Sequence, residues 1–112
     1  MQGTLERPNG TLTYLVKAFA PNRPAPELPD AEYILIEWFE AAPKGRKLLV
    51  RHAGDVIADI RSKFGGGRKI ILQPSNYKTP AEQVRLEFHY QKCGFVYLPT
   101  SSTKWWMYWP HD

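Results

Sequence analysis

EYILIEWF at residues 32–39 is followed by KLLVRHAGDVIADIRSKF at 47–64 and by KIILQ at 69–73. The first and third segments are short apolar runs typical of buried strands, whereas apolar residues in the middle segment recur every three or four positions, as in an amphipathic helix. Three glycines at 65–67 are expected to end that helix, because glycine readily adopts the left-handed C-cap conformation. This order of elements predicts two adjacent parallel strands joined by a helical crossover.

The strand at 32–39 carries apolar side chains on both faces. Such a strand is covered from two sides, so we expect it at the centre of the sheet. Strict alternation places its side chains in two groups, which are Tyr33, Leu35, Glu37 and Phe39 on one face, and Ile34, Ile36 and Trp38 on the other.

The segment before this strand favours a hairpin over residues 3–18. Pro8, Asn9 and Gly10 form a turn signal between two strand-like runs. Leu12, Tyr14 and Val16 alternate on one face of the second run. Residues 20–30, APNRPAPELPD, hold four prolines and are predicted to be an extended loop.

The segment after it predicts a second helix over 80–93 and two final strands. Pro80 suits the first turn of a helix, and Gly94 ends it. Strands are expected at 95–98 and 105–109. Two apolar stripes divide the helix, one of which should face the core: Ala81, Val84 and Phe88 are predicted core residues, and Leu86, Tyr90 and Cys93 lie nearly opposite.

Together these elements predict a single α+β domain over residues 1–112, with a mixed, mostly antiparallel sheet and two helices. A chain of 112 residues is one domain by size, and its 43% hydrophobic content supports one core. A single cysteine excludes an internal disulfide, and no apolar run is long enough for a signal peptide or a membrane span. We therefore expect a cytoplasmic protein without a membrane partner. The net charge of +4 favours anionic ligands.

FHYQKCGF at 88–95, placed after the strand–helix–strand pattern, resembles the GNAT family of N-acetyltransferases. In that family a helical tyrosine is followed at fixed spacing by Gly-Phe at the next strand, as Tyr90, Gly94 and Phe95 are here. The resemblance covers roughly residues 11–109. In its short length, the chain is similar to very small phage-encoded GNAT proteins. It implies a truncated GNAT fold that binds acetyl-CoA, in the host cytoplasm if the protein is phage-encoded.

The resemblance also implies a pyrophosphate-binding turn before the helix at 47–64. The family turn reads Arg/Gln-x-x-Gly-x-Gly/Ala, and the segment here is EAAPKG at 40–45, in which Gly45 matches while Glu40 and Pro43 depart from the pattern. Nearby cations and the helix N-terminus supply positive charge for the phosphates. The implied residues that bind the cofactor are Lys44, Gly45, Arg46, Lys47, Phe39 and Asn76.

The catalytic candidates are one tyrosine and two carboxylates. The resemblance implies that Tyr90 protonates the departing CoA thiolate; the alternative is a buried structural tyrosine. Glu37 and Glu32 are candidate bases for an ammonium acceptor, or else carboxylates in ordinary ion pairs. Cys93 has no evident base partner. The three histidines lack the spacing of metal ligands, so we expect no metal site.

Two functions remain open. The first is transfer of acetyl from acetyl-CoA to an amine, either a small molecule or a protein lysine. The second is a catalytically inactive GNAT-like module that binds and inhibits a host protein. The aromatic segment KWWMYWP at 104–110 is apolar on both faces, so we favour contact with a second copy or a target protein over a purely internal role, and nucleic acid least.

Overall fold

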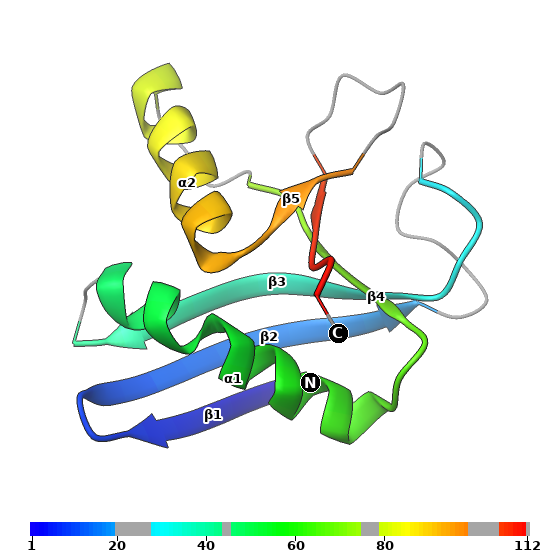
Figure 1. Ribbon diagram of the computed structural model, residues 1–112, viewed down its shortest axis with the longest axis horizontal. Helices are drawn as coiled ribbons and strands as arrows, with labels where there is room; N and C mark the ends of the chain where they lie inside the picture. The colour runs from blue at the N-terminus through cyan, green and yellow to red at the C-terminus, as the bar shows by residue number, and fades with distance from the viewer. Residues whose placement is uncertain (20–27, 44–45, 75–78, 99–105, 112) are drawn as a thin grey trace.

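A computed structural model describes residues 1–19, 28–43, 46–74, 79–98 and 106–111 of the chain (Figure 1). The side chains of residues 19 and 46 are not described. The elements, in chain order, are β1 (Gln2–Arg7), β2 (Gly10–Phe19), β3 (Tyr33–Ala42), α1 (Arg46–Phe64), β4 (Lys69–Leu72), α2 (Pro80–Cys93), β5 (Val96–Tyr97) and β6 (Met107–Tyr108).

The six strands form one mixed sheet in the order β1-β2-β3-β4-β6-β5. β3 and β4 run parallel and side by side, and the other pairings among the described strands are antiparallel. The predicted α+β class, the two helices and the parallel crossover through α1 are therefore confirmed. Neither described helix is long and apolar enough to cross a membrane.

The N-terminal hairpin and α1 form the main core. β1 pairs with β2 across the predicted turn, with Arg7 opposite Gly10. Leu12, Tyr14 and Val16 are buried on the face that α1 covers, as predicted. The α1 stripe also matches the prediction, and its fully or nearly buried members are Leu49, Ala53, Val56, Ile57 and Ile60.

A hydrogen-bonded group ties α1 to the hairpin. The Tyr14 hydroxyl donates to the Asp59 carboxylate, and Lys63 Nζ lies 3.1 Å from Asp59 Oδ2. Gly3 permits this arrangement, because a Cβ there would overlap the Tyr14 ring. At the end of α1, Gly65 has φ 78° and its N–H donates to the Arg61 carbonyl at 2.8 Å, so the predicted glycine stop is confirmed.

A second apolar cluster covers the opposite face of the sheet. It contains Leu28, Tyr33, Ile71, Leu98 and Trp106. β3 therefore has buried residues on both faces, as expected for a central strand.

The alternation predicted for the strand at 32–39 is wrong beyond Ile36. Val16 of β2 pairs with Ile36 and Leu15 with Trp38, so Glu37 is an extra residue in β3, a β-bulge. The bulge reverses which face the following side chains take. Phe39 consequently joins the core under the helices, while Trp38 is exposed.

The prediction of which face of α2 enters the core is also wrong. Val84 and Phe88 are exposed, and the buried residues are Gln83, His89 and Cys93. The polar Gln83 can be buried because its Nε2 donates to the Pro74 carbonyl and to Glu87 Oε2, both at 2.9 Å. The predicted ends are correct, since Thr79 caps the helix, Pro80 begins it and Gly94 ends it with φ 118°.

The final strands are shorter than predicted, with two residues each. β6 lies between β4 and β5, with Met107 opposite Leu72 and Tyr108 opposite Ile71. Trp106 and Met107 are buried within the chain. Trp105 lies outside the described residues, and contact of this segment with another protein stays a prediction.

Candidate functional site

The most distinctive feature of the sheet is the place where β3 and β4 separate. They pair over three positions, from Tyr33 opposite Lys69 to Leu35 opposite Ile71. β4 then ends at Leu72, whereas β3 continues to Ala42 beside β2. Figure 1 shows the two strands diverging toward their C-terminal ends. The carboxyl ends of parallel strands are a common place for ligands, and the opening lies there.

On the side of the helices, the opening is a hollow of about 260 Å³, here called the inner hollow. It brings together Tyr90 from α2 with Glu37 and Phe39 from β3, three of the residues predicted from the sequence. The complete lining is Glu37, Trp38, Phe39, Glu40, Gln73, Leu86 and Tyr90.

Tyr90 is held at this hollow by its aromatic neighbours. Its ring meets the Phe95 ring edge-on, with centroids 6.2 Å apart, and lies 5.6 Å from the His89 ring. Burial, followed by the nearby Cys93, raises the pKa of the Tyr90 phenol above its usual value. The phenol is therefore protonated at neutral pH and is available as a proton donor.

A second hollow of about 210 Å³, the outer hollow, reaches the same opening. It is lined by Leu35, Ile36, Glu37, Gln73 and Trp106. Leu35 and Trp106 belong to the apolar cluster on the face of the sheet away from the helices. Glu37 and Gln73 line both hollows, so the two hollows adjoin at the bulge.

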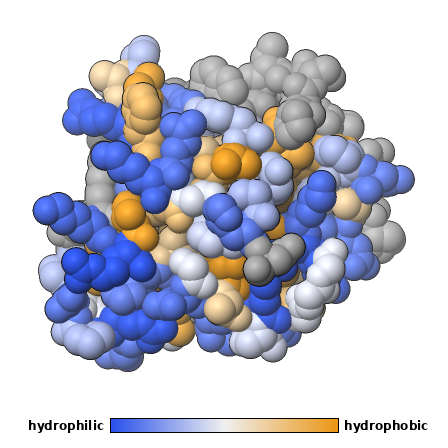
Figure 2. All heavy atoms as spheres, viewed as in Figure 1, coloured by the Kyte–Doolittle hydropathy of each residue, from blue (hydrophilic) through white to orange (hydrophobic). Residues whose placement is uncertain are grey.

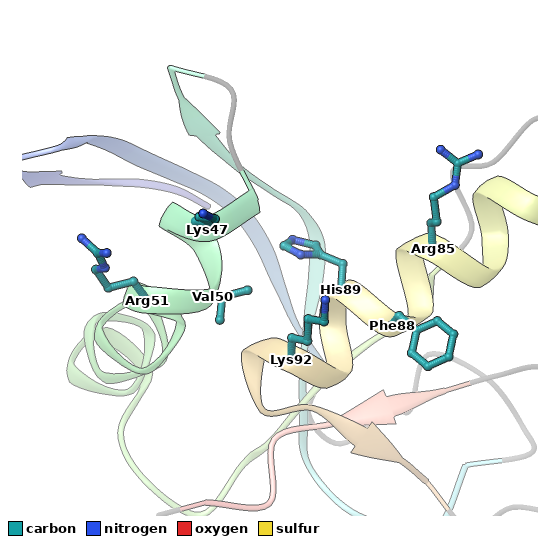
Figure 3. Close-up of a pocket in the computed structure, with 7 residues that line it drawn as sticks. All are labelled: Lys47, Val50, Arg51, Arg85, Phe88, His89 and Lys92. Carbon is teal, nitrogen blue, oxygen red and sulfur yellow. The ribbon is translucent and has the colours of Figure 1, made fainter.

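A third and larger hollow, the basic hollow, lies between α1 and α2 and measures about 860 Å³ (Figure 3). The first turns of α1 and the second half of α2 form its walls, and His89 points from α2 toward α1. Four of its seven lining residues are Lys or Arg. The complete lining is Lys47, Val50, Arg51, Arg85, Phe88, His89 and Lys92.

The charge at the basic hollow is uniformly positive. Among the residues that the structure describes, Lys47, Arg51, Arg85 and Lys92 form no ion pair, and no acidic residue lies in the first turn of α1. The positive end of the α1 dipole adds to these cations. This arrangement suits a ligand with several negative charges.

The other predicted residues divide into two groups. Lys47 lines the basic hollow, and Arg46 begins α1. Lys44, Gly45 and Asn76 lie outside the described residues, so their predicted roles stay predictions.

Glu32 is not brought to the opening. It precedes β3, five residues before Glu37, which is roughly 16 Å along an extended strand. Its carboxylate lies 3.9 Å from Arg68 Nε. This matches the alternative of an ordinary ion pair.

The sequence analysis missed Gln73, Trp106, Arg51, Arg85 and Lys92 as site residues. Lys47 and Arg51 are four apart in one helix, and Arg85 and Lys92 are seven apart in the other, so each pair shares a helix face. That spacing was a usable signal for the basic hollow. No sequence signal marked Gln73 and Trp106 as site residues, because the tertiary pairing of β4 with β6 brings them to the opening.

Cysteine and metal chemistry receive no support from the described residues. Cys93 is buried, and burial raises the pKa of its thiol to about 12, so it is not a thiolate at neutral pH. His52 Nδ1 lies 2.9 Å from Asp55 Oδ2, and His111 Nε2 lies 3.1 Å from the Gly94 carbonyl. No group of three possible metal ligands occurs in the part of the chain that the structure describes.

Comparison with known proteins gives a structural likeness. No family model matches the chain, and no curated protein matches its sequence. Among solved structures, the crystal structure of the anti-CRISPR protein AcrVA5 superposes with a TM-score of 0.56 at 18% sequence identity. The match covers 96% of this chain and 97% of that one, so the two share a fold over nearly their whole lengths.

Proposed function

We propose that this protein is an N-acetyltransferase with a truncated GNAT fold, which transfers acetyl from acetyl-CoA to an amine. One observation carries the proposal: Tyr90 and Glu37 line the same hollow where the parallel strands β3 and β4 separate. A tyrosine and a carboxylate residue thus line the same opening, and a second hollow also reaches it. If the protein is phage-encoded, it acts in the host cytoplasm.

The basic hollow fits the anionic part of acetyl-CoA. The cofactor carries a pyrophosphate and a ribose phosphate, and Lys47, Arg51, Arg85 and Lys92 offer cations to both. The N-terminal N–H groups of α1 add donors for phosphate oxygens. On α2, Leu86 and Tyr90 line the inner hollow while the basic residues line the neighbouring one, so one ligand can extend along this helix.

The reaction is a direct acyl transfer between two substrates. The acceptor ammonium gives one proton to the Glu37 carboxylate, and the amine nitrogen then bonds to the acetyl carbon. The carbon–sulfur bond breaks with its electron pair on sulfur, which takes the Tyr90 proton. The nitrogen passes its remaining extra proton to the Tyr90 oxygen, which gives an amide, a free thiol and one released proton.

The test is to measure acetyl-CoA binding by calorimetry and acetyl transfer to a lysine-containing peptide pool by mass spectrometry. Tyr90→Phe keeps the ring and removes the proton donor. We expect the rate to fall by about 10²–10⁴-fold while the Kd for acetyl-CoA changes little. Tyr97→Phe is the matched control, since its hydroxyl bonds Glu87 on the outside of α2.

Two results would contradict the proposal. If the wild-type chain fails to bind acetyl-CoA at millimolar concentration, the proposed acetyltransferase activity is wrong. A Tyr90→Phe variant that transfers acetyl at the wild-type rate would make Tyr90 a structural residue. Thermal unfolding of each variant, followed by circular dichroism, separates lost chemistry from lost folding.

A second candidate function is inhibition of a host protein without catalysis. The likeness to an anti-CRISPR protein over nearly the whole chain is compatible with inhibition of a host protein. The same Tyr90→Phe variant separates the two functions in a plasmid-interference assay. Equal inhibition of a CRISPR system by the wild type and the variant would favour an inactive binding module, whereas loss with the variant would favour the enzyme.

A further inference from the structure

The exposed apolar side chains of this protein gather on the outer side of α2 and on β5. Among the residues that the structure describes, six large apolar side chains are exposed, and four of them belong to these two elements: Val84, Phe88, Val96 and Tyr97. β5 is also the last strand in the sheet order, with β6 as its neighbour there. Gathered apolar side chains mark binding surfaces, whereas scattered ones are normal.

Three of these side chains line a hollow of about 260 Å³ on the outside of α2, here called the α2 groove. Its complete lining is Val84, Glu87, Phe88, Gln91 and Tyr97. The Glu87 carboxylate accepts hydrogen bonds from the Tyr97 hydroxyl and from Gln83 Nε2, the latter at 2.9 Å. These bonds hold β5 against α2, so the groove is preorganised for a bulky apolar side chain.

Phe88 separates the α2 groove from the basic hollow, because it lines both. Figure 3 shows its ring on the side of α2 away from α1, whereas His89 points toward α1. Arg85 and Lys92, seven residues apart, follow the helix beside Phe88 and line the basic hollow. The surface is therefore an apolar ridge along which these cations form no ion pair with any described residue.

We propose that the outer face of α2 docks an acidic, apolar segment of a partner protein. A leucine, methionine or phenylalanine of that segment fills the α2 groove beside Phe88, and neighbouring aspartates or glutamates pair with Arg85 and Lys92. Charge complementarity at the rim then guides the segment to the groove, and burial of the apolar side chain retains it. The proposal goes beyond acetyl transfer and does not depend on it, since Tyr90 and Glu37 line a different hollow.

Charge favours this occupant over two others. A second copy of the chain would bring the same patch across a two-fold axis, so the four cations of each basic hollow would meet a surface of like charge. A nucleic acid would place phosphates along a groove that the Glu87 carboxylate lines, which is repulsive. An acidic protein segment avoids both repulsions, because its carboxylates lie over the cations and its apolar side chain lies in the groove.

The first experiment selects peptides from a phage-display library of random sequences on the immobilised wild-type chain. It is done without acetyl-CoA, whose phosphates would share Arg85 and Lys92. Peptides that also bind the Phe88→Ala variant are removed. We expect the remaining peptides to combine aspartate or glutamate with a large apolar residue. Enrichment of basic or uncharged peptides, or no enrichment over the Phe88→Ala variant, would overturn the proposal.

The second experiment measures the Kd of one selected peptide by fluorescence anisotropy. Phe88→Ala should raise it by tenfold or more, and the variant is expected to fold because the ring is exposed. Lys92→Glu should raise it several-fold, whereas Lys69→Glu, an equal charge reversal at the start of β4, is the matched control and should leave it unchanged. Equal effects of the two lysine variants would show that general charge, and not this surface, binds the peptide.

The remaining measurements test the other occupants and separate this inference from the proposed function. A dimer in sedimentation velocity that Phe88→Ala dissociates would assign the face to a second copy and overturn the proposal. So would binding of a single-stranded oligonucleotide that is tighter than that of the peptide and is weakened by Phe88→Ala. Tyr90→Phe should bind the peptide as the wild type does, so a failure of acetyl transfer leaves this inference standing, and a failure of docking leaves acetyl transfer standing.

Discussion

The two helices of this protein use their apolar residues in opposite ways. α1 buries its apolar stripe against the sheet, and Ile60, in the C-terminal third of the helix, is 0% exposed. α2 leaves Val84 and Phe88 at 50% and 59% exposure, while Gln83 and His89 are 4% and 6% exposed. Figure 2 shows apolar surface on α2, at the upper left, beside hydrophilic residues.

This contrast separates a structural helix from a helix that forms a site. α1 follows the rule that an amphipathic helix turns its apolar face to the core. α2 breaks it, and Leu86 and Tyr90 on its inner side line the opening beside β3. Departures of this kind from local rules are expected where residues serve a function and not stability alone.

A large loss of stability is expected for Ile60→Ala in α1. The substitution leaves a cavity in a fully buried position, so we expect the free energy of unfolding to fall by about 2–5 kcal/mol. Val84→Ala in α2 is the control, and it should cost less than about 0.5 kcal/mol because half of that side chain is exposed. Urea denaturation measures both, and equal losses would erase the contrast between the helices.

An intermediate effect is expected for Gln83→Ala in α2. Its amide donates to the Pro74 carbonyl and to Glu87, which also accepts from the Tyr97 hydroxyl, so three segments share these contacts. Removing a buried amide that satisfies a carbonyl costs about 1–3 kcal/mol. Gln91→Ala, an exposed glutamine in the same helix, is the control. Equal stability of the two variants in urea would mean that polar contacts do not anchor α2.

Much of the fold was predictable because it follows from local patterns. Apolar residues recur with one clear helical period over the 18 residues 47–64, and the glycines that follow mark the end of the helix. α1 and its buried stripe were therefore predicted correctly. The parallel pair followed from the crossover rule. The bulge at Glu37 was not predicted, since it is defined by the register of β3 against β2, which the β3 sequence alone does not give.

The candidate site was predictable where one residue marks it and not where several segments meet. The family resemblance carried by Tyr90, Gly94 and Phe95 implied a role for Tyr90, and the structure places this residue at one hollow with Glu37 and Phe39. The predicted core stripe of α2 failed because hydrophobicity alone ranked Val84 and Phe88 above a glutamine. Gln83 is buried instead, and its side chain donates hydrogen bonds to Pro74 and Glu87, which lie nine and four positions away.

The smallest effect is expected for Phe88→Ala, which compares two phenylalanines seven residues apart. Phe88 is 59% exposed, so its loss should change the free energy of unfolding by no more than about 0.5 kcal/mol. Phe95→Ala is the matched substitution. Phe95 is 1% exposed and meets Tyr90 and Trp109 edge-on, with centroids 6.2 and 5.2 Å away, so about 3–5 kcal/mol should be lost. Thermal and urea unfolding of both variants measure the difference. A loss above about 1 kcal/mol for Phe88→Ala would show that its ring packs inside the protein, and α2 would then be a structural helix like α1.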